Sequence, residues 1–198
     1  HNLMNGHTFL PRKKLLLATA QLIGVEAESL EDGLEALMER GEVVQEEVAG
    51  ESACYLAELQ EAEEYVSARM TEMAWQELLP PDGLEEILEQ IQREQGITYA
   101  PQQREAVLLA ARRQVMLLTG GPGTGKTTSL RGVLALFDAL GLETALAAPT
   151  GRAAKRLGDL CGVEAATIHR LLETQFDPGT GRLVFAHDES EPLRADAV

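Results

Sequence analysis

The chain has 198 residues, of which 44% are hydrophobic and 25% charged, with a formal net charge of −15. These values are ordinary for a globular protein with one large or two small cores. No apolar run approaches the roughly 18 residues needed to cross a membrane, and no signal peptide opens the chain, so a membrane protein is excluded and a cytoplasmic location expected. The chain does not begin with Met, which suggests an excerpt, and its two cysteines fit free thiols.

The negative charge lies in the first half of the chain. Residues 1–99 carry 6 Lys and Arg against 21 Asp and Glu, whereas residues 100–198 carry 11 of each. Binding to nucleic acid by counterion release needs local positive charge, so the total does not favour such a partner. A neutral second half can still present a basic strip on one face.

Residues 1–57 are typical of a small winged-helix-like unit. Arg12–Ile23 has helical periodicity, Ser29 is an expected N-cap of a second helix, and residues 42–48 and 53–59 form an expected hairpin. Helix, helix and hairpin is the winged-helix order, whose usual role is DNA binding. The second helix is rich in acidic residues, so a structural or protein-contact role is favoured. The side of the first helix expected to be buried comprises Leu15, Leu16, Ala18, Thr19, Leu22 and Ile23.

Residues 58–98 are acidic and helical in pattern, which indicates a connector with a solvated face. The prolines of LLPPDGL at 78–84 interrupt the helix, and Asp82 is the expected cap of the helix that follows.

Residues 99–198 alternate between strand and helix patterns. We expect a buried strand at 115–119, a helix at 126–140, a strand at 143–148 and a helix from Arg152 to about Leu160. A short helix at 167–172 and a hairpin within 175–185 follow. Alternating strands and helices predict an α/β fold with a parallel sheet.

The segment GGPGTGKTT between the first strand and helix matches the Walker A pattern. Glycines let successive backbone N–H groups converge on phosphate oxygens, and the helix N-terminus favours the same anion. Lys126 is expected to bind the β- and γ-phosphates, and the Thr127 hydroxyl to bind Mg²⁺; these two are the candidate catalytic residues. The other expected nucleotide contacts in the loop are Gly121, Pro122, Gly123, Thr124, Gly125 and Thr128.

Upstream of the loop, ITYAPQQREAV resembles the Q motif of superfamily 1 helicases, in which a glutamine recognises adenine. Gln103 aligns with that glutamine better than Gln102 does. A carboxamide has one donor and one acceptor group, which match the N6 and N7 edge of adenine. Taken alone, the residue is more readily interpreted as an ordinary surface glutamine, but its position relative to the glycine-rich loop favours the Q motif. The resemblance therefore implies ATP as the nucleotide.

Downstream, APTGRAAKRLG resembles motif Ia of the same helicases, and TIHRLL resembles a further block of the RecD-like branch. Together with the loop, these motifs make residues 99–198 similar to RecD-like helicases, with a RecA-like motor domain. The resemblance implies translocation in the 5′ to 3′ direction on single-stranded DNA, in repair or recombination, and other proteins as partners of the acidic first half. The implied DNA contacts are Thr150, Gly151, Arg152 and His169.

No Asp-Glu pair suited to polarising water follows an apolar strand after the loop, because Asp188-Glu189 lies in a polar segment. We therefore expect an incomplete motor domain that binds nucleotide weakly and hydrolyses nothing measurable by itself. Two alternatives remain open, namely another P-loop ATPase such as an AAA+ remodeller, and a nucleotide-gated adaptor without enzymatic activity.

Overall fold

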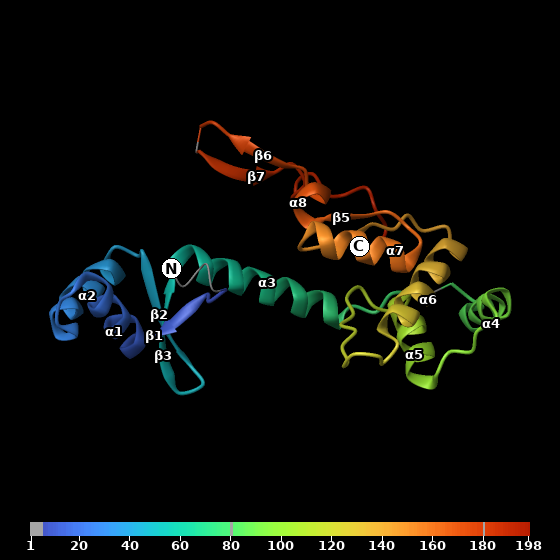
Figure 1. The fold of residues 1–198 in the computed structure, drawn as a ribbon, viewed down its shortest axis with the longest axis horizontal. Helices are drawn as coiled ribbons and strands as arrows, with labels where there is room; N and C mark the ends of the chain where they lie inside the picture. Colours follow the sequence, from blue (N-terminus) through green and yellow to red (C-terminus); the bar gives the residue numbers. More distant parts are fainter. Residues whose placement is uncertain (1–5, 80, 180) are drawn as a thin grey trace. The chain divides into compact units, whose positions relative to one another are not determined.

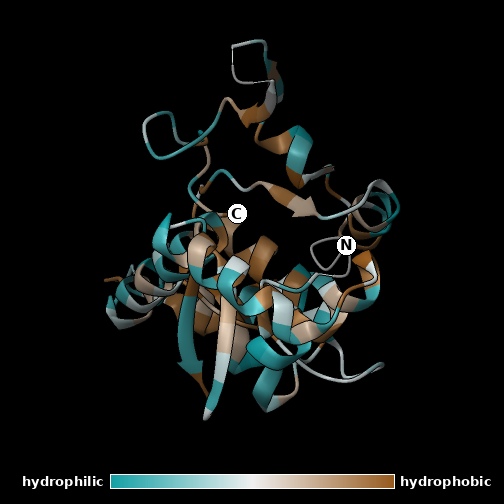
Figure 2. Cartoon of the chain, turned by 90° about the vertical axis from the view of Figure 1, so that its left-hand side faces the viewer, coloured by the Kyte–Doolittle hydropathy of each residue, from teal (hydrophilic) through white to brown (hydrophobic). Residues whose placement is uncertain are grey.

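The computed structural model describes residues 6–79, 81–179 and 181–198. The chain forms two compact units, an N-terminal unit, His1–Glu72, and a C-terminal unit, Met73–Val198, each with its own core (Figure 1). Polar and apolar residues alternate along the helices of both, as expected where one face packs on a core (Figure 2). Among the described residues, no helix is long and apolar enough to cross a membrane.

The N-terminal unit combines helices with a three-stranded antiparallel sheet. Its order is β1 (Phe9–Pro11), α1 (Arg12–Ile23), the 3₁₀ turn η2 (Ala27–Leu30), α2 (Glu31–Glu39), β2 (Val43–Val48), β3 (Glu51–Leu56) and most of α3 (Ala57–Trp75). Strand β3 lies between β1 and β2. The predicted order of helix, helix and hairpin is therefore present, and the winged-helix interpretation stays a prediction.

The hairpin between β2 and β3 turns in two residues, Ala49 and Gly50, because Val48 pairs with Glu51. Both turn residues have positive φ, 53° and 81°, the conformation that matches the twist of the flanking strands. This turn is shorter than the four-residue gap that the sequence suggests.

Two predictions for the helices of this unit are wrong. Leu22 and Ile23 are 79% and 58% exposed, whereas Leu16 and Ala20 are buried, because the core contacts α1 only on the side that faces α2 and β3. Ser29 caps no α-helix: it lies inside η2, and its hydroxyl donates to the carbonyl of Glu26 at 2.7 Å.

Arg12, at the start of α1, forms hydrogen bonds that connect this helix to α2 and β2. Its guanidinium donates to Glu31 and Glu35 of α2, each at 2.6 Å, and to Gln45 of β2 at 2.7 Å. The side chain is only 22% exposed.

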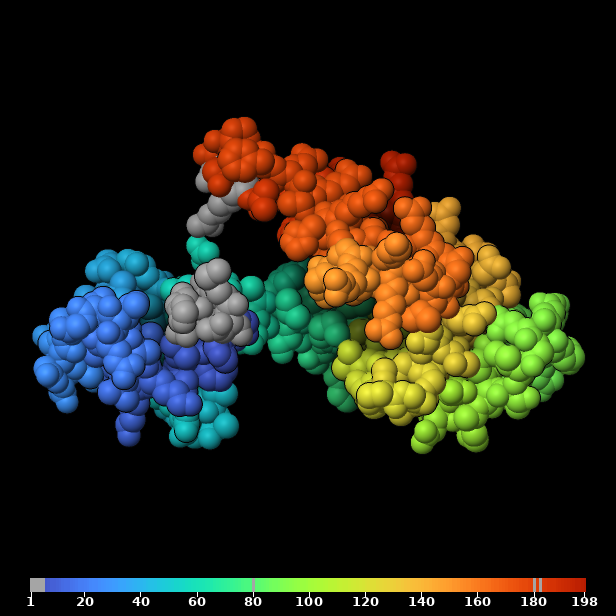
Figure 3. Space-filling model, viewed as in Figure 1, coloured from blue at the N-terminus to red at the C-terminus, as the bar shows by residue number. Residues whose placement is uncertain are grey.

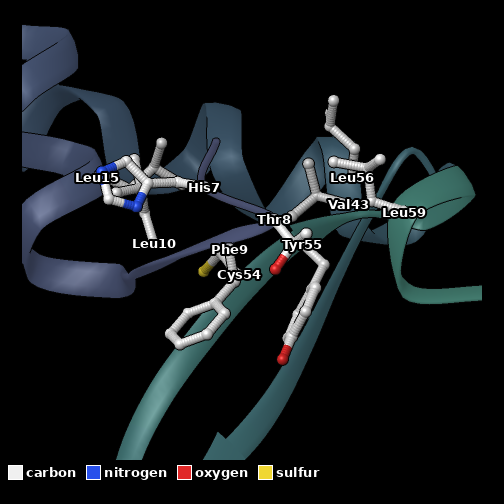
Figure 4. Close-up of a pocket in the computed structure, with 10 residues that line it drawn as sticks. All are labelled: His7, Thr8, Phe9, Leu10, Leu15, Val43, Cys54, Tyr55, Leu56 and Leu59. Carbon is white, nitrogen blue, oxygen red and sulfur yellow. The ribbon is translucent and has the colours of Figure 1, made fainter. Parts of the chain in front are cut away.

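Beside β1 and β3 an apolar cavity of about 220 Å³ is lined by residues that include Phe9, Cys54 and Tyr55 (Figure 4).

The C-terminal unit is built around α4 (Leu84–Gln95), α5 (Pro101–Ala110) and α6 (Lys126–Ala139). Their shared core consists of Leu84, Leu88, Ile91, Tyr99, Val107, Leu108, Val133 and Leu136. Helix α4, which the sequence pattern assigns to the connector, thus packs with the loop-bearing helix α6. The predicted cap Asp82 is wrong, since Gly83 with φ 82° precedes α4 and no side-chain cap is present.

The rest of this unit comprises β4 (Leu146–Ala148), α7 (Gly151–Cys161), β5 (Ala165–Thr167), α8 (Ile168–Leu171), β6 (Thr174–Asp177) and β7 (Arg182–Phe185). Strands β4 and β5 are parallel, in register from Leu146 opposite Ala165, and β6 and β7 form the predicted hairpin. Thr144 also bridges Ala197 in parallel. The α/β P-loop class with a parallel sheet is confirmed.

The predicted buried strand at 115–119 is wrong. Residues 115–120 have no strand assignment, and Leu117 and Leu118 are 82% and 37% exposed. A strand exists only when its N–H and C=O groups pair with a neighbour. Among the described residues, the strand pairings are confined to other segments, and the nearest bridge joins Glu77 to Arg113. Strand β5 was not expected, because Ala165–Thr167 is too short for periodicity to reveal.

Candidate nucleotide-binding site

The glycine-rich loop lies open to solvent on the C-terminal unit, and its residues 120–124 are all exposed. This part of the chain is coloured yellow in Figure 3. Gly123 and Gly125 have φ of 76° and 83°, a left-handed conformation that residues with a Cβ atom rarely adopt. The two glycines therefore shape the turn that leads into α6.

The loop is held by two side chains of its own. The ammonium of Lys126 donates to the carbonyls of Gly120 and Gly121, the latter at 2.7 Å. The Thr124 hydroxyl donates to Gly121 at 3.0 Å. The positive charge of Lys126 therefore lies at the loop. There the ammonium could donate to a phosphate oxygen in place of a loop carbonyl.

The start of α6 is suited to an anion. Helix α6 begins at Lys126, and its N-cap Gly125 supplies no side chain that could satisfy the first-turn N–H groups. These groups carry the positive end of the helix dipole. Thr127 and Thr128 follow in the same turn and bring two hydroxyl groups. The donor set of backbone N–H groups, one ammonium and hard oxygen atoms fits a polyphosphate with Mg²⁺.

The magnesium itself would draw most of its ligands from elsewhere. No group of three or more His, Cys, Asp or Glu side chains able to hold a metal ion occurs in the described ranges. Mg²⁺ in nucleotide sites is commonly bound through substrate phosphates, water and one or two protein oxygens. The Thr127 hydroxyl, in the first turn of α6, is an oxygen that could serve as one of these ligands.

Gln103 lies directly beside this loop. It is the third residue of α5, and its side-chain Oε1 accepts from the backbone N–H of Ala100 at 3.1 Å. Its Nε2 is so close to the Cα of Gly125 that an added Cβ there would collide with it. The structure therefore brings together Gln103 and the loop, which are more than 15 residues apart in sequence.

A buried tyrosine, which sequence reasoning missed, fixes the chain just before Gln103. Tyr99 is 5% exposed, and burial raises the pKa of its phenol. Its hydroxyl donates to Gln95 Oε1 at 3.2 Å and its N–H donates to Gln92 Oε1 at 2.9 Å. The aromatic ring packs over Gly132 of α6, where there is no room for a Cβ. The signal for it in the sequence was a single aromatic residue shortly after a helix that ends at a glycine.

Thr150, Gly151 and Arg152 lie where β4 ends and α7 begins. The Thr150 hydroxyl accepts from the N–H of Ala153 at 3.3 Å and so caps α7, which packs against both α6 and β4. Gly151 and Arg152 are exposed in the first turn. This arrangement presents backbone N–H groups and a cationic side chain to solvent next to the loop-bearing helix.

His169 is exposed on α8, and its ring lies 6.0 Å from that of Phe185. Thr167 caps this short helix by accepting from the N–H of Arg170 at 3.2 Å. Parallel pairing of β5 with β4 places α8 near the strand that leads to Thr150.

The large cavity of this unit is separate from the loop. Its volume is about 1010 Å³, and it is lined mainly by apolar residues of α6 and of the segments 73–81, 110–118, 140–142 and 195–198. None of residues 120–128 lines it. The candidate site is therefore the open loop with Gln103, as expected for a ligand held by backbone and charge rather than by an apolar cavity.

Known proteins match both parts of the chain. A family model described as an AAA domain matches residues 103–198. The ATP-dependent RecD2 DNA helicase of Deinococcus radiodurans is 30% identical over 202 residues, which cover 98% of this chain and 27% of that protein. The RecBCD enzyme subunit RecD of Mycolicibacterium smegmatis is 35% identical over 49% of this chain, and that of Mycobacterium tuberculosis is 40% identical over 36%.

The chain spans about 27% of the length of the RecD2 relative and 21% and 16% of the two RecD subunits. The match to RecD2 extends over both units, whereas the AAA model covers the loop, α6 and the parallel strands. Together with the geometry of the glycine-rich loop, these matches show that the chain belongs to the RecD-like family of P-loop proteins.

Proposed function

We propose that this chain binds ATP with Mg²⁺ as part of an ATP-dependent DNA helicase that moves 5′ to 3′ along single-stranded DNA. The observation that carries the proposal is the contact between Gln103 and the loop at Gly125. It puts a group able to recognise adenine beside groups able to hold the phosphates. The similarity to a RecD2 DNA helicase supports the proposal further.

In this proposal each residue has a separate task. Gln103 contacts the adenine base. The backbone N–H groups of the loop surround the phosphates, namely those of Gly121, Gly123, Thr124, Gly125 and Thr128. Pro122 lies in the same turn but has no N–H to donate. Lys126 leaves the Gly120 and Gly121 carbonyls for the β- and γ-phosphates, and Thr127 contributes its oxygen to the magnesium. The metal neutralises phosphate charge when bound.

Nucleotide binding is tested by competition between ATP and GTP for a fluorescent ATP analogue. We expect ATP to compete better than GTP. Gln103→Ala should remove that preference, and Lys126→Ala should weaken the binding of both nucleotides. Gln102→Ala, a change of the same size one residue away on the exposed side of α5, is the matched control. If GTP competes as well as ATP in the unaltered chain, the assignment of Gln103 is refuted.

The proposed DNA contacts are Thr150, Gly151, Arg152 and His169, with exposed Lys155 and Arg156 next to them. A helix N-terminus and nearby cations bind phosphates without recognising bases. We expect salt-sensitive binding of an oligothymidine strand that Arg152→Ala weakens. Lys13→Ala, which removes an equal charge from an exposed site on α1, should leave binding unchanged. Equal losses in both variants would contradict a specific DNA site.

We expect no measurable hydrolysis from these 198 residues alone, because no Asp-Glu pair suited to polarising the attacking water follows an apolar strand after the loop. Single-turnover release of phosphate from ATP measures this. DNA-stimulated hydrolysis would refute it. A partner of the acidic first half in repair or recombination also belongs to the proposal. In an AAA+ remodeller the ATP preference would not depend on Gln103, and an adaptor would show neither that preference nor DNA binding.

A further inference from the structure

The side chain of Gln103 can present its amide to the loop in two orientations, which differ by a flip of Oε1 and Nε2. The backbone N–H of Ala100 distinguishes them, since it donates to Oε1 at 3.1 Å. A flipped amide would turn its NH₂ group toward this donor and leave both without an acceptor. The Ala100 N–H therefore holds Nε2 on the side of Gly125.

The donor that sets this orientation is itself held in place. Ala100 follows Tyr99, whose N–H donates to Gln92 Oε1 at 2.9 Å and whose ring is buried in the core of the unit. Gln92 lies on α4, which packs on α5 and α6. Two consecutive backbone N–H groups are thus fixed by two glutamines, one on α4 and one on α5. We call this arrangement the amide lock and define it by Gln92, Tyr99, Ala100 and Gln103.

We propose that the amide lock, acting on the adenine contact of the proposed function, is what makes the site reject purines that carry an oxygen at position 6. Adenine offers an acceptor at N7 and a donor at N6, so it matches an amide whose Nε2 and Oε1 are fixed in this order. Guanine and hypoxanthine offer acceptors at both N7 and O6. A locked Oε1 meets O6 as a second acceptor, whereas a free amide could turn its NH₂ group toward O6.

The lock can be opened by replacing the N–H hydrogen of Ala100 with the ring carbon of a proline. Ala100 has φ −61° and ψ 155°, which are the values that a proline adopts and that a residue before Pro101 prefers. Ala100→Pro therefore removes the donor with little change of backbone. Ala100→Val keeps the N–H and an extended backbone and is the matched control. Gln92→Leu, a second variant, loosens Tyr99 without altering residues 100–103.

The assay measures dissociation constants of the full 198-residue chain for ATP, ITP and inorganic tripolyphosphate by competition. ITP carries an oxo group at position 6 and a proton on N1 where ATP carries an amino group and an unprotonated N1, so its N7 and position-6 edge offers two acceptors. Tripolyphosphate tests the loop without a base. For Ala100→Pro we expect the ratio of ITP to ATP dissociation constants to fall about threefold to tenfold, the effect of one hydrogen bond. Gln92→Leu should lower it in the same direction, and Ala100→Val should not. Binding of tripolyphosphate should be unchanged in all three.

The outcomes separate the lock from the function on which it rests. If Gln103→Ala leaves the ATP preference intact, the adenine contact itself is wrong. If Gln103→Ala abolishes the preference while both Ala100→Pro and Gln92→Leu keep it, the adenine contact stands and the lock is refuted. If the lock had only a structural role, the variants Ala100→Pro and Gln92→Leu would weaken the binding of ATP, ITP and tripolyphosphate equally. That result also overturns the inference.

Discussion

Replacing Gly132 with alanine tests how tightly α6 is packed against the residues that carry the site. Gly132 is a buried residue in the middle of α6. A Cβ built there would lie 2.7 Å from Val107 Cγ2, 2.8 Å from the Tyr99 hydroxyl and 2.9 Å from Tyr99 Cζ. The tyrosine ring is buried and rigid, so it cannot move aside as the end of a flexible side chain would.

Two effects oppose each other in this variant. Alanine in a helix interior is more stable than glycine by about 1 kcal/mol. Overpacking a filled core costs about 1–3 kcal/mol. Because three contacts are too short and two involve the same ring, we expect the upper part of that range. The free energy of unfolding of the C-terminal unit should therefore fall by about 1–2 kcal/mol.

Gly33 in α2 is the matched control, because nothing lies within 4 Å of a Cβ at that position. Gly33→Ala should keep the gain in helix propensity and stabilise the N-terminal unit by up to about 1 kcal/mol. Hydrogen exchange measured on peptides from α6 and α2 reports the two units separately. If Gly132→Ala slows exchange in α6, the packing of Tyr99 over this helix has been misread.

Four further outcomes are expected. Arg12→Met should lower the free energy of unfolding of the N-terminal unit in urea by about 1–2 kcal/mol, because it leaves two carboxylates and an amide without their donor; a loss below about 0.3 kcal/mol would contradict this. Thr150→Ala should cost about 1 kcal/mol and speed exchange at the start of α7, whereas Thr150→Ser should not. Burial raises the pKa of Tyr99 above its ordinary 10.0, so stability that is complete below this value is lost as pH rises through the folded pKa, and Tyr99→Phe should flatten that decline above pH 10.0. Iodoacetamide should modify the partly exposed Cys161 before the buried Cys54, as mass spectrometry of timed samples can show.

Local patterns predicted the elements whose conformation depends on near neighbours. Arg12–Ile23 was expected as a helix, and α1 has these bounds, with Gly24 at φ 75° as its C-cap. The helix after the glycine-rich loop, the two hairpins and the helix headed by Thr150 were also expected. Each depends on residues a few positions apart, which a periodicity or a cap records in the sequence.

Predictions that needed a distant partner were less successful. The apolar residues of 115–119 favour a strand, but a strand requires a neighbour to pair with. Burial of Leu22 was inferred from one stripe of α1, whereas the core meets only part of that stripe. Asp82 and Ser29 have the right chemistry for caps, but the chain starts its helices one or two residues later.

The sequence by itself determined that a glycine-rich turn follows residue 119 and that a helix begins at Lys126, because spacing within nine residues suffices for both. It did not contain the contact of Gln103 with Gly125, the hold of Lys126 on two loop carbonyls, or the support of Ala100 by Gln92 and Tyr99. Those relations depend on how α4, α5 and α6 pack around one core. Packing sums many weak contacts between distant residues, so only the tertiary structure could decide which side chains meet at the loop.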